Sequence, residues 1–377
     1  MSAPRIKGWC PGAYRPMESG DGLVVRVRPF AGEMRADQVL GLCDLAERYG
    51  SGMIDVTRRA NVQVRGVAEA DHRALLDGLA GLDLLDDDPA MEMRRNILVT
   101  PFRAPGDLSC RLVEALTEAL PRLPELPAKV GYGVDTGAAR VLADDAADIR
   151  FERGAEGGLI LRLDGKDRGW AIAEDRASEA LIEVVRWFAD RITPDARRMA
   201  RVVALHTPPA DWTATEPAPK AAPAQPGMGD HGTLLGVPLG RCHAVDLRGL
   251  MEGSGATGLR VTPWRMLLLV TRTMPDHPAF LSRADDPLLR VDACPGAPYC
   301  PSASVETRAL ARALAPDAPG TLHISGCSKG CARPAPADVA LVGRNGAFDL
   351  VRKGCAWDEP LIRGLAPTET KARLRTI

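Results

Sequence analysis

Two short stretches, Cys294-Pro-Gly-Ala-Pro-Tyr-Cys300 and Gly326-Cys-Ser-Lys-Gly-Cys-Ala-Arg-Pro334, carry four cysteines at close spacing. The gap between them is long enough for a helix and a strand, so the fold can bring the four thiolates together. Soft thiolate ligands select zinc or iron–sulfur clusters. A structural zinc site usually has about two to four residues between paired ligands, whereas the first pair here has five. The spacing favours an iron–sulfur cluster, with zinc as the alternative, on Cys294, Cys300, Cys327 and Cys331.

The residues around these cysteines predict how the chain would contact a cluster. Gly296, Gly326 and Gly330 would let backbone amides approach the inorganic sulfides. Ser302 is a good N-cap residue. We therefore expect a helix that begins directly after Cys300 and points its positive N-terminal end at the negatively charged cluster.

The remaining five of the nine cysteines have no partner at ligand spacing. Cys43 and Cys110 fall on helical faces and are expected in the core, while Cys242 and Cys355 stand alone. Cys10 lies in an irregular N-terminal arm, and the sequence assigns it no role. Because the chain shows no export signal and the cytosol keeps thiols reduced, metal binding explains the clustered cysteines better than a disulfide framework does.

The composition describes a folded chain of two or three domains, with 377 residues of which 45% are hydrophobic. The formal net charge of -1, from 48 basic and 49 acidic side chains, provides no general positive field for nucleic acid. No apolar run reaches the length of a membrane span, and the segment Met1–Pro16 has no apolar signal core. We expect a cytoplasmic protein without a nucleic-acid or membrane partner.

A pattern repeated at long range divides the chain into two halves. The stretch Ile54-Asp-Val-Thr-Arg-Arg-Ala-Asn-Val-Gln-Val64 aligns with Leu259-Arg-Val-Thr-Pro-Trp-Arg-Met-Leu-Leu-Leu269. Farther along each half, Ala147-Asp-Ile-Arg-Phe-Glu-Arg-Gly154 parallels Ala337-Asp-Val-Ala-Leu-Val-Gly-Arg344. Two matches in the same order indicate a tandem duplication. Since only the second copy holds the clustered cysteines, we predict one site shared between unequal halves, the alternative being halves that simply diverged.

Hydrophobic periodicity predicts a mixture of helices and strands. Strands are expected at Leu23–Pro29 and within Met53–Gly66. The stretch 208–229, rich in Pro and Ala, is typical of an extended, semi-rigid linker between the copies. Helices are expected at Ala36–Tyr49, Asp107–Leu120 and Ala173–Asp190.

The cysteine motifs and the duplication resemble those of the sirohaem-dependent sulfite and nitrite reductases. Within that superfamily, two further stretches are most similar to the precorrin-3B synthases of aerobic cobalamin biosynthesis. They are Gly8-Trp-Cys-Pro-Gly-Ala-Tyr-Arg-Pro-Met-Glu-Ser-Gly-Asp-Gly-Leu23 and Thr57-Arg-Arg-Ala-Asn-Val-Gln-Val-Arg-Gly66. The resemblance covers nearly the whole chain.

The resemblance implies an α+β, internally duplicated nitrite/sulfite reductase-like fold, with two ferredoxin-like half-domains and two α/β domains of the cluster type. The half-domains are expected at residues 15–75 and 230–280. A first α/β domain without a cluster is expected at 85–205, and a [4Fe-4S] domain at 285–365. The Pro/Ala-rich linker 208–229 separates the copies.

The resemblance also implies which residues bind the substrate. In the reductases, arginines and a lysine of the first half meet the tetrapyrrole carboxylates and the small anion on the face of the ring. Arginine suits this task because its rigid fork pairs with carboxylates and stays charged; the alternative for each arginine is a solvated charge at a strand edge. By motif, these roles fall on Arg26, Arg59, Gln63, Arg65, Arg95 and Lys129.

Two positions depart from the reductase pattern. Gly131 stands where the reductases commonly carry a second lysine, and Arg65 stands where they often carry histidine. Reduction of sulfite or nitrite needs positive charge and proton delivery at the bound oxyanion. The missing lysine therefore weighs against reductase activity.

The activity implied is oxygen-dependent hydroxylation of precorrin-3A at C20, with a ring acetate closing a γ-lactone to give precorrin-3B. The implied cofactor is a [4Fe-4S] cluster, and the resemblance also admits a mononuclear non-haem iron, for which none of the six histidines is assigned. No G-x-G-x-x-G follows a strand, so precorrin-3A and dioxygen would be joined by an external electron donor. The alternatives are a sirohaem-dependent nitrite or sulfite reductase and a cluster protein that only relays electrons or senses iron.

Overall fold

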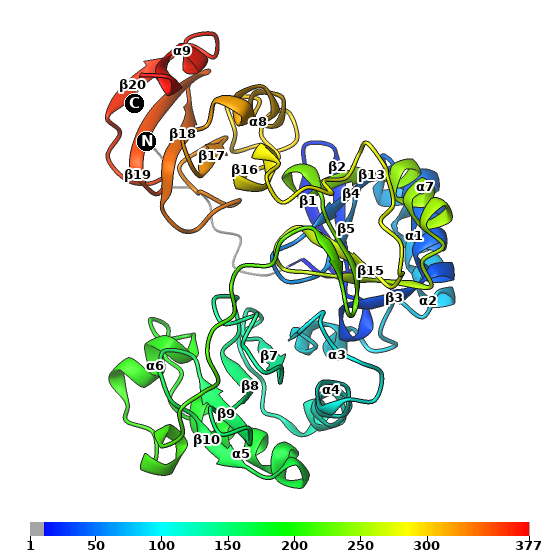
Figure 1. Cartoon of the computed structure of the whole chain (residues 1–377), viewed down its shortest axis with the longest axis vertical. Helices are drawn as coiled ribbons and strands as arrows, with labels where there is room; N and C mark the ends of the chain where they lie inside the picture. The colour runs from blue at the N-terminus through cyan, green and yellow to red at the C-terminus, as the bar shows by residue number, and fades with distance from the viewer. Residues whose placement is uncertain (1–10, 377) are drawn as a thin grey trace.

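The computed structural model describes residues 11–376, which form four five-stranded sheets. Two of these sheets build a central unit, and each of the other two belongs to an α/β domain (Figure 1). The C-terminal α/β domain, in orange and red, contacts the central unit on the side away from the helices α1 and α7. Among residues 11–376, no helix has the length and apolar character that crossing a bilayer requires.

The central unit contains the same series of elements twice. In each copy a short hairpin precedes a third strand, a helix and a second hairpin. The first copy comprises β1 (Met17–Ser19), β2 (Gly22–Val27), β3 (Glu33–Arg35), α1 (Ala36–Tyr49), β4 (Met53–Val56) and β5 (Val62–Val67). The second comprises β11 (Gly227–Gly229), β12 (Gly232–Gly236), β13 (Arg241–His243), α7 (Ala244–Ser254), β14 (Gly258–Val261) and β15 (Met266–Leu269).

The two copies exchange an edge strand. The sheet orders are β1-β2-β5-β4-β13 and β11-β12-β15-β14-β3, so β3 pairs with β14 and β13 pairs with β4. The helices α1 and α7 pack together, and one apolar core includes Val39 and Leu42 of the first copy with Leu247 and Leu250 of the second. The half-domains therefore form a single folded unit.

The helix α1 spans the residues expected from its apolar stripe. Val39, Leu42 and Ala46 are buried on one face, and the side-chain oxygen of Gln38 accepts a hydrogen bond from the Arg35 amide at 2.9 Å. The helix ends at Gly50. This stripe, spaced at helical period, made the element predictable from the sequence.

The first α/β domain has three parallel strands followed by two antiparallel ones. Its sheet comprises β6 (Ile97–Val99), β7 (Tyr132–Asp135), β8 (Ile149–Arg153), β9 (Leu159–Leu163) and β10 (Trp170–Ile172). The expected helices are present as α4 (Leu108–Ala119) and α5 (Ala177–Ala189). Three short helices complete this half of the chain, α2 (His72–Gly81), α3 (Pro89–Arg94) and α6 (Met199–Leu205).

The C-terminal domain repeats this topology, with three parallel strands and then two antiparallel ones. Its elements are β16 (Val291–Ala293), α8 (Arg308–Leu314), β17 (Leu322–Ser325), β18 (Ala337–Arg344), β19 (Ala347–Gly354), β20 (Ile362–Leu365) and α9 (Thr370–Leu374). The duplicated α+β architecture expected from the sequence is thereby confirmed.

Within the stretch 208–229, a short 3-10 helix (Ala210–Thr213) precedes an extended segment that is bound along the first α/β domain. Single bridges join Thr215 to Gly169, Pro217 to Gly154 and Lys220 to Arg140. Trp212, only 2% exposed, stacks on Trp170 at a centroid distance of 5.4 Å. The segment is therefore a strap held by the domain until it enters β11.

Candidate cluster and substrate site

The two cysteine-bearing loops follow neighbouring parallel strands. Cys294 comes directly after β16, and Cys327 comes just after β17. Parallel neighbours end at the same edge of a sheet, so both loops leave that edge together. The amide of Gly326 donates a hydrogen bond to Sγ of Cys294 at 3.1 Å. A backbone amide therefore binds a cysteine sulfur in this loop, as the presence of Gly326 in the motif predicts.

The four thiols share one region. Burial raises the pKa of Cys294, and nearby Cys300 and Cys327 raise it further, although the Gly326 and Gly296 amides oppose them. Burial also raises the pKa of Cys331, and the other three sulfurs act in the same direction. A positive metal centre bound by these sulfurs would favour their thiolate forms.

Two glycines in the loops have a steric role. Gly296 has a φ of +69°, and a Cβ there would lie 2.5 Å from Oγ1 of Thr307. Gly330 has a φ of +62° and would place a Cβ 3.0 Å from the Trp357 ring. Since both backbones are left-handed and both neighbours are close, a larger residue would disturb the cysteine loops.

The helix expected directly after Cys300 is not there. Residues 301–307 are turns and bends, and α8 begins only at Arg308, with Thr307 at the N-cap position. The Thr307 hydroxyl donates to the carbonyl of Cys294 at 2.6 Å, and the Ser304 amide donates to Gly326. These contacts hold the loop against the second cysteine stretch, so Ser302 caps no helix and that prediction was wrong.

Among residues 11–376 there is no group of three or more His, Cys, Asp or Glu arranged to hold one metal ion. In a four-iron cluster each thiolate binds a different iron, so its sulfurs lie farther apart than the ligands of one zinc ion. A set of four thiolates supported by a backbone amide has the chemistry that such a cluster requires. The described part of the chain offers no ligand set for the additional mononuclear iron, and Cys10 lies outside it.

Arg59 and Lys129 meet at the junction between the first half-domain and the first α/β domain. Nη2 of Arg59 donates to the carbonyl of Lys129 at 3.1 Å, and the Lys129 side chain is exposed. The Asn96 amide donates to the carbonyls of Ala128 and Val130, both at 3.2 Å, and so fixes the segment that carries the lysine. The guanidinium of Arg59 is thus tied to the backbone of Lys129, which belongs to the other domain.

Arg26 and Gln63 lie in one row across the first half-domain sheet. Arg26 is opposite Gln63, Gln63 is opposite Asp55, and Asp55 is opposite Arg241. With its oxygen facing Arg26, the Gln63 amide accepts from Nη2 at 3.0 Å and from Nε at 3.2 Å. The row continues into the second copy because Arg241 belongs to the exchanged strand β13. Arg241 was missed from the sequence since no local pattern reveals that exchange.

Arg65 and Arg95 are occupied by the chain's own carboxylates. Arg65 is 3% exposed and binds Asp21 through Nε at 2.9 Å and Nη2 at 2.6 Å. Arg95 is 6% exposed and binds Asp86 through Nη2 at 2.8 Å. A buried guanidinium needs such a counter-charge, and these pairs supply it. The two residues are built into the protein interior, where the chain's own carboxylates are their partners.

The carboxylate of Asp55 organises the charges beneath the cysteine loops. Nε of Arg241 approaches it at 2.5 Å, and Arg65 and Arg308 each lie 3.5 Å away. Burial alone would raise the pKa of Asp55, but the hydrogen bond to Arg241 and the positive charges of Arg308, Arg241 and Arg65 hold it below its usual value. Asp55 is therefore an ionised structural residue.

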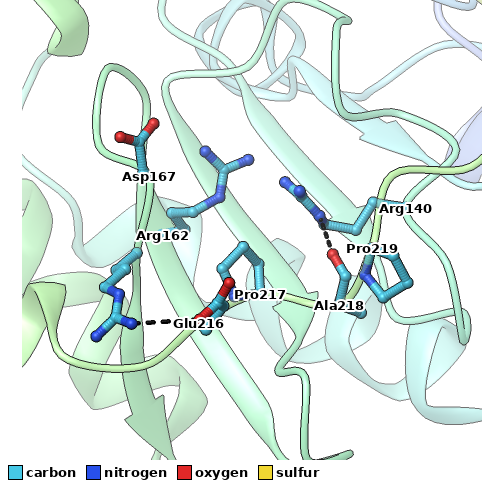
Figure 2. A pocket seen from close by; sticks show the side chains of 8 residues that line it. Arg140, Arg162, Asp167, Glu216, Pro217, Ala218 and Pro219 are labelled. Atoms are coloured by element: carbon cyan, nitrogen blue, oxygen red, sulfur yellow. Dashed lines mark hydrogen bonds and ion pairs between the residues drawn. The ribbon is translucent and has the colours of Figure 1, made fainter.

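A cavity of about 340 Å³ lies elsewhere, between the strap and the first α/β domain (Figure 2). Its arginines already have partners. Nε of Arg140 donates to the carbonyl of Ala218 at 2.7 Å, and Nη2 of Arg168 donates to Glu216 at 3.2 Å. Arg162 is held in a bidentate pair by buried Glu152, behind the cavity. These contacts fix the strap, so we do not assign the cavity to the substrate.

Comparison with known proteins agrees with this architecture. Residues 15–82 match the family described as the nitrite/sulfite reductase ferredoxin-like half domain. The chain is 28% identical to a precorrin-3B synthase of Sinorhizobium sp, over 93% of this chain and 83% of the relative. It is 25% identical to a ferredoxin–nitrite reductase of Synechococcus elongatus, over 90% and 79% of the two chains. The structure of the Mycobacterium tuberculosis NirA protein aligns with a TM-score of 0.69 at 19% identity, covering 94% of this chain and 79% of that one.

These comparisons confirm a nitrite/sulfite reductase-like fold and a resemblance to precorrin-3B synthase along most of the chain. Both named sequence relatives are oxidoreductases. The NirA likeness, at 19% identity, concerns the fold alone.

Proposed function

We propose that this chain, with its reductase-like fold and its likeness to precorrin-3B synthase, is an oxygen-dependent hydroxylase of precorrin-3A. The product would be precorrin-3B, hydroxylated at C20 and closed to a γ-lactone. One oxygen atom of dioxygen would enter the product, and the other would leave as water with two electrons and two protons from an external donor. The proposed setting is the cytoplasm, which keeps thiols such as the four clustered cysteines reduced.

The observation that carries this proposal is a pair of contacts made by the turn between β4 and β5. Nη1 of Arg58 donates to the carbonyl of Ala332, beside Cys331, at 3.4 Å, while Nη2 of the next residue, Arg59, donates to Lys129. Adjacent arginines thus link the cysteine loop to the segment of the first α/β domain that carries Lys129. A ring with carboxylate arms bound at this turn would lie beside both the cysteine loop and Lys129.

The first cysteine stretch, Cys294–Cys300, is tied to the same half-domain. The carbonyl of Tyr299, next to Cys300, accepts from the Gly20 amide at 3.0 Å, and Arg241 lies 5.4 Å from the centroid of the Tyr299 ring. Both cysteine loops therefore face the sheet that carries Arg26, Gln63 and Asp55. We propose that this face is the floor of the substrate site.

The side chains at the junction suit a polycarboxylate. Arg59 and Lys129 are accessible, and a charge-assisted hydrogen bond to a carboxylate contributes about 1.5–3 kcal/mol. In the proposed mechanism these two residues bind the acetate and propionate arms and orient the ring. When bound on Cys294, Cys300, Cys327 and Cys331, a [4Fe-4S] cluster would supply single electrons to the reaction. No residue is assigned as a general acid or base.

The surroundings of Gly131 favour the hydroxylase over the reductase alternative. Gly131 is buried, and a Cβ there would meet the Asn96 carbonyl oxygen at 3.2 Å. A lysine at this position would press on the residue that fixes the Lys129 segment. In addition, Arg95 is neutralised by Asp86. With fewer free cations, the site is less suited to stabilise a reacting oxyanion.

The test supplies anaerobically purified protein with precorrin-3A, an electron source and ¹⁸O-labelled dioxygen. The proposal predicts a lactone product that carries one labelled oxygen, and no such product from Cys327→Ser. Label that enters only from water would contradict it. Brisk reduction of nitrite or sulfite by a protein purified with sirohaem would instead establish the reductase alternative.

A further inference from the structure

A buried group of charged side chains lies where the half-domain sheet meets the C-terminal domain. The side chains of Arg65, Arg241 and Arg308 are only 4%, 7% and 17% exposed. Two carboxylates accompany these three guanidinium groups, so the group as a whole retains one positive charge. Its members are Asp21, Asp55, Arg65, Arg241 and Arg308.

Arg308 is the member with the weakest compensation. Its Nη2 lies 3.5 Å from Oδ1 of Asp55, while Nε and Nη1 are buried without a hydrogen-bond partner. Burial lowers the pKa of Arg308 to about 10, since the charge of Asp55 only partly opposes it, so the group stays positive at neutral pH. A buried charge left this way costs free energy unless another negative group lies nearby.

The cysteine loop is the place where such a negative group, an iron–sulfur cluster, would be bound. Arg308 is the first residue of α8, and the preceding Thr307 donates its hydroxyl hydrogen bond to the carbonyl of Cys294 at 2.6 Å. Arg241, which shares Asp55 with Arg308, lies against the ring of Tyr299 in the same loop. The uncompensated charge is therefore close enough to the loop for the charge of Cys294 to act on it.

A dissolved ligand cannot reach Nε and Nη1 of Arg308 because both atoms are closed off from solvent. A cluster can still interact with the charge of Arg308, because an electrostatic interaction needs no direct contact. A four-iron cluster on four thiolates is an anion, and it gains one further negative charge on reduction. Net charge near a cluster is one of the factors that set its reduction potential.

We infer that Arg308 is a positioning residue whose buried positive charge stabilises the reduced form of the cluster and so raises its reduction potential. This inference rests on the cluster in the proposed function and adds to it a residue that binds neither iron nor substrate. Asp55 acts in the opposite direction because it cancels part of the same charge.

The experiment measures the cluster potential by redox titration followed by electron paramagnetic resonance, on the reconstituted full chain. Two unit charges about 10 Å apart at an effective dielectric constant of about 20 change an equilibrium constant by roughly tenfold. Arg308→Gln should therefore lower the one-electron reduction constant about tenfold, which is about 59 mV. Arg308→Lys keeps the charge and should stay near the wild-type value.

Two further variants separate charge from structure. Asp55→Asn should raise the potential, which a general loosening of the site would not do. Arg73→Gln, at an 84% exposed position on α2, should leave it unchanged. An unchanged potential in Arg308→Gln with a full cluster would overturn this inference alone. If Arg308→Gln holds no cluster, a lowered or unchanged potential in Asp55→Asn overturns it; a wild-type chain that assembles no cluster overturns the proposed function as well.

Discussion

The turns Thr57–Asn61 and Thr262–Met266 occupy equivalent places in the two copies and have the same backbone. In each, the threonine Oγ1 accepts hydrogen bonds from amides two and four residues later, at 3.2–3.3 Å. The fourth residue has a positive φ in both, 52° at Ala60 and 58° at Arg265. The duplication has preserved this framework.

The side chains make the two turns chemically different. In the first copy Arg59 and Lys129 present accessible cations. In the second, the residue equivalent to Arg59 is Trp264, which stacks on Phe102 at 6.0 Å and donates from Nε1 to Asp145 at 3.0 Å. The second turn therefore packs against the first α/β domain through aromatic side chains. The two turns have the same backbone, but only the first turn presents accessible cations to which an anionic ring could bind.

The largest expected effect separates cysteines of the loops from cysteines of the core. Cys327→Ser should remove the brown chromophore and about four irons per chain, because each thiolate holds part of the cluster. Cys43→Ser is the matched control, since burial raises the pKa of Cys43 to about 12 and keeps it a neutral thiol. Metal and sulfide analysis checks both, and full iron with unchanged colour in Cys327→Ser would refute the cluster assignment.

The next largest expected effect concerns the second turn, Thr262–Met266, which we call the filled turn because Trp264 packs there. Trp264→Ala should lower the free energy of unfolding by about 3 kcal/mol, because a large aromatic side chain leaves a cavity and Asp145 loses its donor. Substrate affinity should not change. Denaturant unfolding measures the stability, and a stable Trp264→Ala protein would show that this junction is not held by packing.

Substitutions at the first turn, Thr57–Asn61, and at Lys129 should have the opposite effect and change substrate affinity but not stability. Arg59→Ala or Lys129→Ala should weaken precorrin-3A binding by about 1.5–3 kcal/mol, the range for a charge-assisted hydrogen bond. Stability and the cluster spectrum should stay near wild type. Titration calorimetry under anaerobic conditions checks the affinity, with the exposed Arg73→Ala as control. Unaltered affinity in both site variants would remove the basis for the proposed substrate site.

The smallest expected effect is a pH dependence at the filled turn. Burial, which the hydrogen bond from Trp264 only partly offsets, raises the pKa of Asp145 to about 6. The folded state thus binds this proton more tightly than the unfolded chain, whose pKa is about 3.9. Stability from this group is fully present below about pH 4 and is lost as the pH rises through 6. Asp145→Asn should abolish that slope, and an identical slope in denaturation curves from pH 4 to 7 would exclude Asp145 as its source.

Local patterns predicted much of the fold. The apolar stripe of Ala36–Tyr49 defined α1, and the repeated strand pairs indicated the duplication. The strand exchange could not be predicted, because β3 and β13 are three residues each and pair with partners about half the chain or more away. Edge pairing of that kind depends on tertiary contacts that leave no local pattern.

The candidate site was predictable only in part. The four cysteines stand in local motifs, and the structure brings them to one sheet edge. The partners of Arg65 and Arg95 come from distant acidic residues, so residue type alone could not distinguish a buried ion pair from a substrate contact. The roles of Arg241 and Arg308 depend on the exchanged strand and on the late start of α8, and they were missed for the same reason.

The most direct test of one site between unequal copies is the iron, sulfide and tetrapyrrole content of anaerobically purified protein, read together with its optical spectrum. We expect about four irons and four sulfides per chain, a broad brown absorption and no sirohaem. Zinc in place of iron, or a stoichiometric sirohaem with its strong sharp absorption, would contradict this account.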